Sequence, residues 1–198
     1  MQPGQYAPPP RQAQKFPVWI IVIIVVVVGA VFFVGILAAL GIYGTRRYIG
    51  AAKTAEAKNT IGAIARGARA SFERESSDPS APHKLCGSAT TVPVAVPAGT
   101  KYMPGVSAGS DFNTGDAENG WMCLKFSMTQ PIYYQYSYHQ GSGYIGPASQ
   151  SPGPTGFEAA ARGDLDGNGK TSLFVLTGMA SSDSVSVSTT MFIDNEME

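Results

Sequence analysis

The sequence predicts an α+β fold in which one long N-terminal helix packs on an antiparallel sheet of four to five strands. Residues 18–43 carry no charge, and residues 45–75 contain no proline while their apolar side chains recur at helical spacing. After Gly120 the apolar period changes to two, which is typical of strands. A helix with one apolar stripe and a sheet with one apolar face bury both by packing together, which gives the α+β class.

The composition fits one membrane anchor followed by one domain of modest size. The chain has 198 residues, a net charge of zero and a charged fraction of only 14%, with 23 glycines and 14 prolines. Such a composition favours a loop-rich extracytoplasmic module over a charge-rich cytosolic one. The lack of a basic bias argues against a nucleic-acid partner.

Residues 1–17 are predicted to be a disordered, Pro-rich cytoplasmic tail. Pro8, Pro9 and Pro10 are consecutive, and the segment has too little apolar surface to offset the entropy of ordering. The proline run favours an extended polyproline conformation. It is either a solvated spacer or a ligand for an aromatic groove.

Residues 18–43 are predicted to cross the membrane as one helix. About 20 apolar residues, rising about 1.5 Å each, span the hydrocarbon core, and this run is longer. Lys15, Phe16 and Trp19 stand at its start, where basic and aromatic residues typically meet lipid headgroups. We therefore expect lipid of the inner membrane as a partner.

The sequence contains signals for both orientations of this segment in the membrane. The basic residues that follow it outnumber those before it, which by the positive-inside rule favours a cytoplasmic domain. The cysteines and the Gly-, Ser- and Thr-rich sequence beyond favour a cytoplasmic tail and a periplasmic domain, the orientation we expect. A cleaved secretory signal is the rival interpretation, because Ala39 and Gly41 are small residues at a plausible processing site.

Residues 44–76 are predicted to continue the helix as an amphipathic extension that Ser76, Ser77, Asp78 and Pro79 end. Its predicted apolar stripe consists of Tyr48, Ala52, Ala55, Ile61, Ile64, Ala68 and Phe72. Glycines inside this helix cost stability against alanine, so we expect bends or close helix contacts at some of them.

Residues 77–120 are predicted to be a loop region in which only residues 92–96 resemble an edge strand. Residues 121–198 are predicted to form the antiparallel sheet. The expected strands are residues 121–127, 132–139, 157–162 and 173–178, and residues 185–193 are a candidate fifth. In the second of these, Tyr134, Tyr136 and Tyr138 share one face, an arrangement typical of packing against a neighbouring strand or helix. A ligand platform is the alternative.

Cys86 and Cys123 are the two cysteines of the chain, and both lie beyond the membrane segment. They form either one disulfide that closes a long loop, our expectation, or two free buried thiols. A disulfide would place the domain in an oxidising compartment. We expect it to tie the loop region to the first strand of the sheet.

A candidate calcium loop lies between the third and fourth predicted strands. Asp164, Asp166 and Asn168 alternate with other residues, as oxygen ligands do at the start of an EF-hand loop, and Ser172 adds another oxygen. The bidentate glutamate of that loop is replaced by Val175, and the same residue types also make a tight hairpin turn.

No catalytic arrangement is predicted. His83 and His139 have no cysteine, histidine or carboxylate partner at a spacing typical of a metal or nucleophile site. We therefore expect neither enzymatic activity nor a small-molecule substrate.

The segment GILAALGIYGTRRYIGAAKTAEAKNTIGAI, residues 35–64, resembles the helix of type IV pilins and type II secretion pseudopilins. Residues 126–138 and 161–178 resemble pilin-like proteins of myxobacteria. The resemblance implies a membrane-anchored structural or assembly protein of a type IV pilus or a type II secretion-like system. Its partners would be other pilin-like subunits or assembly proteins. Small residues would let the helices approach closely: Gly35, Ala38, Ala39 and Gly41.

The sequence departs from the pilin pattern in the membrane segment. In an alignment on Gly35, Val26 replaces the glutamate of the family and Ile21 replaces the glycine before the cleavage site. The proline that kinks many pilin helices aligns with Tyr43, so a straighter helix is expected. These departures favour an alternative function, a non-polymerising anchored periplasmic binding module with calcium as a candidate ligand.

Overall fold

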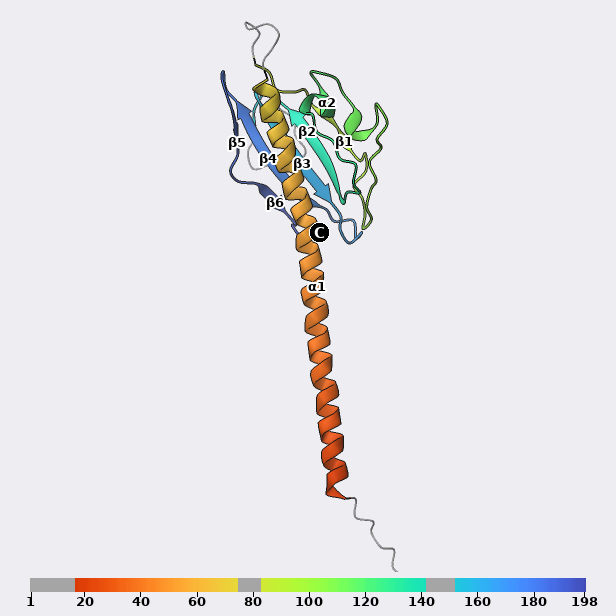
Figure 1. Cartoon of the computed structure of the whole chain (residues 1–198). Helices are drawn as coiled ribbons and strands as arrows, with labels where there is room; N and C mark the ends of the chain where they lie inside the picture. The colour runs from red at the N-terminus through yellow and green to blue at the C-terminus, as the bar shows by residue number, and fades with distance from the viewer. Residues whose placement is uncertain (1–16, 75–82, 142–151) are drawn as a thin grey trace, which may run out of the picture. The chain divides into compact units, whose positions relative to one another are not determined.

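The computed structural model describes residues 17–74, 83–141 and 152–198, and its overall class is α+β. The chain divides into two compact units, Met1–Tyr48 and Ile49–Glu198. The helix α1, Val18–Phe72, runs for 55 residues and contributes to both units (Figure 1). The predicted tail lies outside the described residues, apart from Pro17.

In the first unit, the apolar residues of α1 are exposed, apart from the half-buried Ile20. None of the most apolar part of α1 is buried in the structure. By length and composition, α1 can cross a membrane once, and no other helix in the described ranges can. An apolar surface of this extent is unfavourable in water and is expected to lie in lipid.

The second unit contains one antiparallel sheet of six strands. In spatial order, β1 (Ala89–Val92), β2 (Tyr134–Gln140), β3 (Gly156–Gly163), β4 (Ser172–Ala180) and β5 (Val185–Val187) are neighbours. The short strand β6 (Phe192–Asp194) also pairs with β4. The strands predicted at residues 132–139, 157–162 and 173–178 are confirmed, and the predicted fifth strand is divided into β5 and β6.

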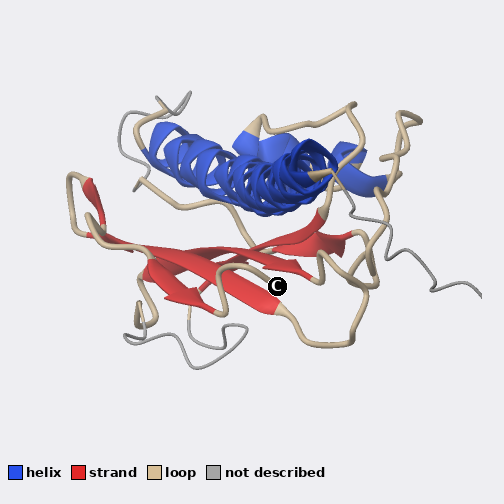
Figure 2. Ribbon diagram, turned by 90° about the horizontal axis from the view of Figure 1, so that it is seen from below, coloured by secondary structure: helices blue, strands red, loops and turns tan. Residues whose placement is uncertain are grey.

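The second half of α1 packs on one face of this sheet (Figure 2). Ile61, Ile64 and Ala68 of the helix are fully buried in the same apolar cluster as Tyr136 of β2 and Phe174 of β4. Burying these side chains contributes about 1.5–3 kcal/mol for each large one. The predicted packing of helix on sheet is therefore confirmed.

The face that α1 buries differs at its start from the predicted stripe. Tyr48, Ala52 and Ala55 are exposed, whereas Thr54 and Ala57 are buried. Thr54 can be buried because its hydroxyl donates to the carbonyl of Ala51 within the helix. The sequence pattern counted Thr54 as polar and therefore assigned Ala55, one residue further along, to the buried face of the helix.

The strand predicted at residues 121–127 is wrong, because this segment contains the short helix α2, Gly120–Leu124. Trp121, Cys123 and Leu124 are buried on one side of its single turn. Lys125 ends the turn in the left-handed conformation, with φ of 50°. An apolar run this short has no period long enough to distinguish a helix from a strand.

The first strand of the sheet instead falls inside the segment predicted as loop. The predicted edge strand, residues 92–96, begins where β1 ends, at Val92. The strand does not continue past Val92 because Pro93 has no backbone N–H to donate to the sheet. The same segment holds the 3-10 turn η1, Asp111–Asn113. Helix α1 ends at Phe72, and the residues predicted to terminate it, 76–79, lie outside the described ranges.

Candidate functional site

The tyrosine ladder, defined as Tyr134, Tyr136 and Tyr138, is completely buried between the sheet and α1. The hydroxyl of Tyr136 donates to Glu56 Oε1 on α1 over 3.1 Å, and that oxygen also accepts the N–H of Tyr133 at 3.0 Å. Burial raises the pKa of all three ladder hydroxyls well above the usual value. The packing prediction is confirmed, and a fully buried ladder offers no surface to a ligand.

The candidate calcium residues lie in the turn that joins β3 to β4. The carboxylate of Asp164 accepts backbone N–H groups from Gly167 at 2.8 Å, Asn168 at 3.1 Å and Gly169 at 3.0 Å. Asp164 is only 5% exposed. Gly167 and Gly169 have positive φ angles of 77° and 85°, which the turn requires. The carboxylate thus closes the turn from inside, as in the hairpin interpretation of this sequence.

The other candidate ligands are not all directed toward one point. Asn168 donates its side-chain N–H groups to Asp166 at 2.8 Å and to Glu198 at 2.9 Å. Ser172 is buried and donates to the carbonyl of Gly163 instead. Within the described ranges, no group of three or more histidine, cysteine or acidic side chains is arranged to hold a metal. Calcium binding stays a prediction.

The small residues predicted for helix packing lie on α1 within the first unit, and all four are exposed: Gly35, Ala38, Ala39 and Gly41. A Cβ atom built on either glycine would meet no atom within 4 Å. Another helix could therefore approach the backbone closely at these positions. Their role in packing stays a prediction.

The predicted disulfide is confirmed between Cys86 and Cys123, whose Cα atoms are 5.8 Å apart. It joins the segment before β1 to α2, and the expected link to a first strand at residue 121 is wrong because that strand is absent. Arg74, just after α1, donates to the carbonyl of Cys123 over 2.9 Å. The end of α1, the segment before β1 and α2 are therefore held together.

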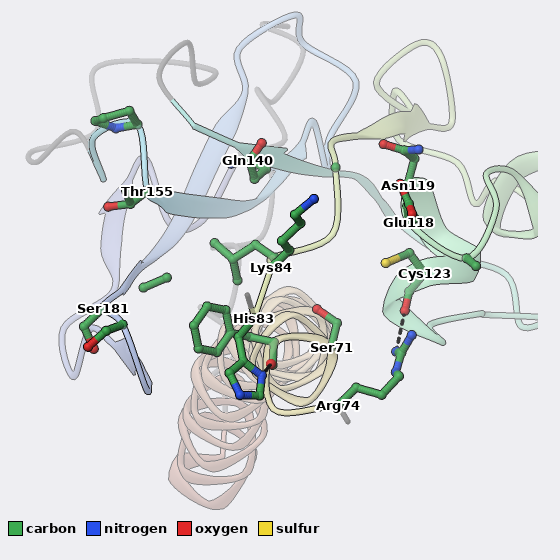
Figure 3. A pocket seen from close by; sticks show the side chains of 17 residues that line it. Ser71, Arg74, His83, Lys84, Glu118, Asn119, Cys123, Gln140, Thr155 and Ser181 are labelled. Carbon is green, nitrogen blue, oxygen red and sulfur yellow. Dashed lines mark hydrogen bonds between the residues drawn. The ribbon is translucent and has the colours of Figure 1, made fainter. Parts of the chain in front are cut away.

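These three segments border a cleft of about 960 Å³ that the sequence did not predict (Figure 3). Its lining comes from the end of α1, the segment before β1, the segment before α2 together with Cys123, the end of β2, the segment before β3 and the end of β4 with the residues that follow it. The charged and histidine side chains of the lining are Arg74, His83, Lys84 and Glu118. The sequence signal for this cleft is weak, because its residues are far apart in the chain.

The wall that carries Lys84 is fixed on both sides. His83 Nδ1 lies 2.8 Å from the carbonyl oxygen of Phe72, and the centroids of the His83 and Phe72 rings are 5.4 Å apart. On the other side, Cys86 is in the disulfide, and Gly87 donates to the carbonyl of Glu118 over 2.8 Å. Lys84 therefore stands on a short segment with little freedom to move.

Lys84 has no acidic partner within the part of the chain that the structure describes, where the two ion pairs are Lys58–Glu196 and Arg69–Glu73. Figure 3 shows its side chain directed into the cleft, between Gln140 and the segment of Glu118 and Asn119. The cleft thus presents the ammonium group of Lys84, without an ion pair in the described ranges, in a lining that also holds the charged side chains of Arg74 and Glu118.

Comparisons with known proteins do not add to these observations. No protein-family model, curated protein or solved structure matches this chain. Function must therefore be argued from the residues and their arrangement.

Proposed function

We propose that this chain is a membrane-anchored structural or assembly protein of the pilin type, acting in a type IV pilus or a type II secretion-like system. The observation that carries the proposal is the continuous helix α1. Its first part is an exposed apolar span, and its second part is the buried spine of a disulfide-bonded α+β unit. The resemblance of residues 35–64 to pilin helices supports the same function.

The proposed mechanism is packing of α1 against the helices of neighbouring subunits in the membrane. The four small residues from Gly35 to Gly41 are exposed and allow close backbone approach in lipid. The disulfide favours a non-cytoplasmic location for the second unit, which in this proposal is the periplasm. The tail would then lie in the cytoplasm.

Disulfide cross-linking in cell membranes tests the proposed contact. Both natural cysteines are in the Cys86–Cys123 disulfide, so an added cysteine is the only thiol expected to react. Ala38→Cys should give cross-linked dimers, whereas Leu40→Cys should not, because it lies about 200° around the helix from Ala38. Equal cross-linking at both positions, or none at Ala38, would contradict the proposal.

Mass measurement and N-terminal sequencing of the protein from cells test whether it is processed. A start inside the apolar run would support a processed pilin. An intact Met1 would instead favour an anchored protein that is not cut, as the residues at Ile21 and Val26 suggest.

A non-assembling anchored binding module is the second candidate function. The absence of a carboxylate at Val26 favours it, since pilins use one at this point of the helix. Calcium is its candidate ligand at the Asp164 turn. An ion that binds only the folded state raises the melting temperature, so melting without a shift between millimolar calcium and chelator would exclude this site.

A further inference from the structure

The cleft at the end of α1 has the features of a ligand site, independently of whether the protein assembles. Its volume of about 960 Å³ lies within the range of small-molecule sites, roughly 300–1,000 Å³. The disulfide, the Arg74–Cys123 hydrogen bond and the contact of His83 with Phe72 fix the wall formed by the end of α1, the segment before β1 and α2. A wall that is already fixed loses little conformational entropy when a ligand binds.

The polar groups of the cleft define the chemistry of the ligand. The ammonium group of Lys84, the side-chain amide of Gln140 and the hydroxyl of Thr155 have no partner within the described ranges (Figure 3). They line the same cleft from three segments, which are the segment before β1, the end of β2 and the segment before β3. Lys84 suits a carboxylate, and the amide and hydroxyl groups suit the hydroxyl groups of a ligand.

The lining also disfavours other ligand classes. Phe72, its one aromatic residue of the Phe, Tyr or Trp type, is only 4% exposed, so no aromatic surface is available for a flat hydrophobic ligand. The carboxylate of Glu118 stands across the cleft from Lys84 and would repel a ligand that carries several negative charges. The charged lining residues Arg74, Lys84 and Glu118 sum to one positive charge, which suits a ligand with a single carboxylate and otherwise neutral polar groups.

We propose that this cleft binds a hydroxylated carboxylate, a sugar acid, with Lys84 facing the carboxylate and with Gln140 and Thr155 facing the hydroxyl groups. The same chemistry is found in a free sugar acid and in a uronic-acid residue of a polysaccharide. The cleft is large enough for more than one sugar ring, so a short oligomer should bind more tightly than the free acid.

The proposal is tested by isothermal titration calorimetry of the full chain in detergent micelles. The probes are D-glucuronate and a short oligogalacturonate, with D-glucose as the neutral control and hexanoate as the control without hydroxyl groups. Glucuronate should bind with a Kd of about 1 mM or lower, and the oligomer should bind more tightly. Glucose and hexanoate should bind at least about tenfold more weakly, which is about 1.4 kcal/mol.

Variants identify the cleft as the site. Lys84→Gln should weaken glucuronate binding at least about tenfold, because it removes a charge-assisted hydrogen bond. Lys170→Gln is the matched control, since Lys170 is an exposed lysine in the β3–β4 turn and outside the cleft lining. Both side chains are exposed, so both variants should keep the unfolding curve of the parent.

Three results would overturn the proposal. These are the absence of binding by every probe at millimolar concentration, equal affinity of Lys84→Gln and the parent, and equal affinity for glucuronate and hexanoate. Tighter binding of glucuronate than of the oligomer would overturn the part concerning a polysaccharide. None of these results depends on whether the chain assembles in the membrane.

Discussion

The contact between α1 and α2 makes a sharp prediction about two glycines of the same helix. A Cβ atom at Gly67 would lie 2.7 Å from the carbonyl oxygen of Leu124 in α2, a distance at which one of the two must move. A Cβ atom at Gly62 would meet only the end of the Arg66 side chain, at 3.5 Å. The two glycines are therefore equivalent in helix propensity and opposite in the space around them.

The expected changes in the free energy of unfolding follow from these distances. Alanine is about 1 kcal/mol more favourable than glycine inside a helix, so Gly62→Ala should be more stable by up to about that amount. Gly67→Ala gains the same helix propensity, but its Cβ atom would press on the carbonyl oxygen of Leu124, and such overpacking costs about 1–3 kcal/mol. Because the Cys86–Cys123 disulfide restrains α2, the carbonyl cannot move away freely. Gly67→Ala should therefore be less stable than Gly62→Ala by about 1–3 kcal/mol.

Urea unfolding of the full chain in detergent micelles, followed by tryptophan fluorescence, measures both variants. Trp121 belongs to α2 and is fully buried, so its emission reports on the contact concerned. Trp19 lies in the first unit and is common to both variants. If Gly67→Ala were as stable as Gly62→Ala, the close approach of α1 to Leu124 would be refuted.

Three further perturbations test the second unit. Replacing Cys86 and Cys123 by serine removes a disulfide between residues 37 apart in the sequence. The free energy of unfolding, measured in urea, should fall by about 4 kcal/mol, and an unchanged midpoint would contradict this. Burial raises the pKa of the three ladder hydroxyls, so they ionise at lower pH in the unfolded state than in the folded state. The stability that they contribute should be complete below about pH 10 and should fall above it by up to about 1.4 kcal/mol per pH unit for each tyrosine. No loss of stability up to pH 11.5 in circular dichroism would refute that account. Glu56→Ala leaves the buried Tyr136 hydroxyl without its acceptor and should lower the free energy of unfolding by about 1–3 kcal/mol. Glu73→Ala, the control, removes an exposed ion pair and should lower it by under about 1 kcal/mol.

The candidate sites were predicted to different extents because they depend on contacts of different range. The Asp164 turn was located from its sequence, since a turn between two strands is closed by residues within five positions of one another. The cleft was not located, because Lys84, Gln140 and Thr155 line it together only when the segment before β1, the end of β2 and the segment before β3 are assembled. No local period or motif connects them.

The sequence by itself determined the elements whose signal is local and long. The apolar span, the helical course of α1, the strands β2, β3 and β4, and the inward face of the tyrosine ladder all follow from periods of 3.6 or 2 sustained over several residues. The two cysteines beyond the apolar span likewise indicated their disulfide.

Only the tertiary structure decided the elements that are short or that face more than one neighbour. The run at Trp121 is helical because the close contact with α1 at Gly67 and the disulfide at Cys123 favour a turn there over a strand. β1 pairs with the edge of β2; Thr90, Thr91 and Val92 favour a strand, but four residues are too few to show a period in the sequence. The buried face of α1 was fixed by where the sheet meets it. The conformational preference of a few residues contributes less free energy than these tertiary contacts. The contacts therefore decide which structure each of these short segments adopts.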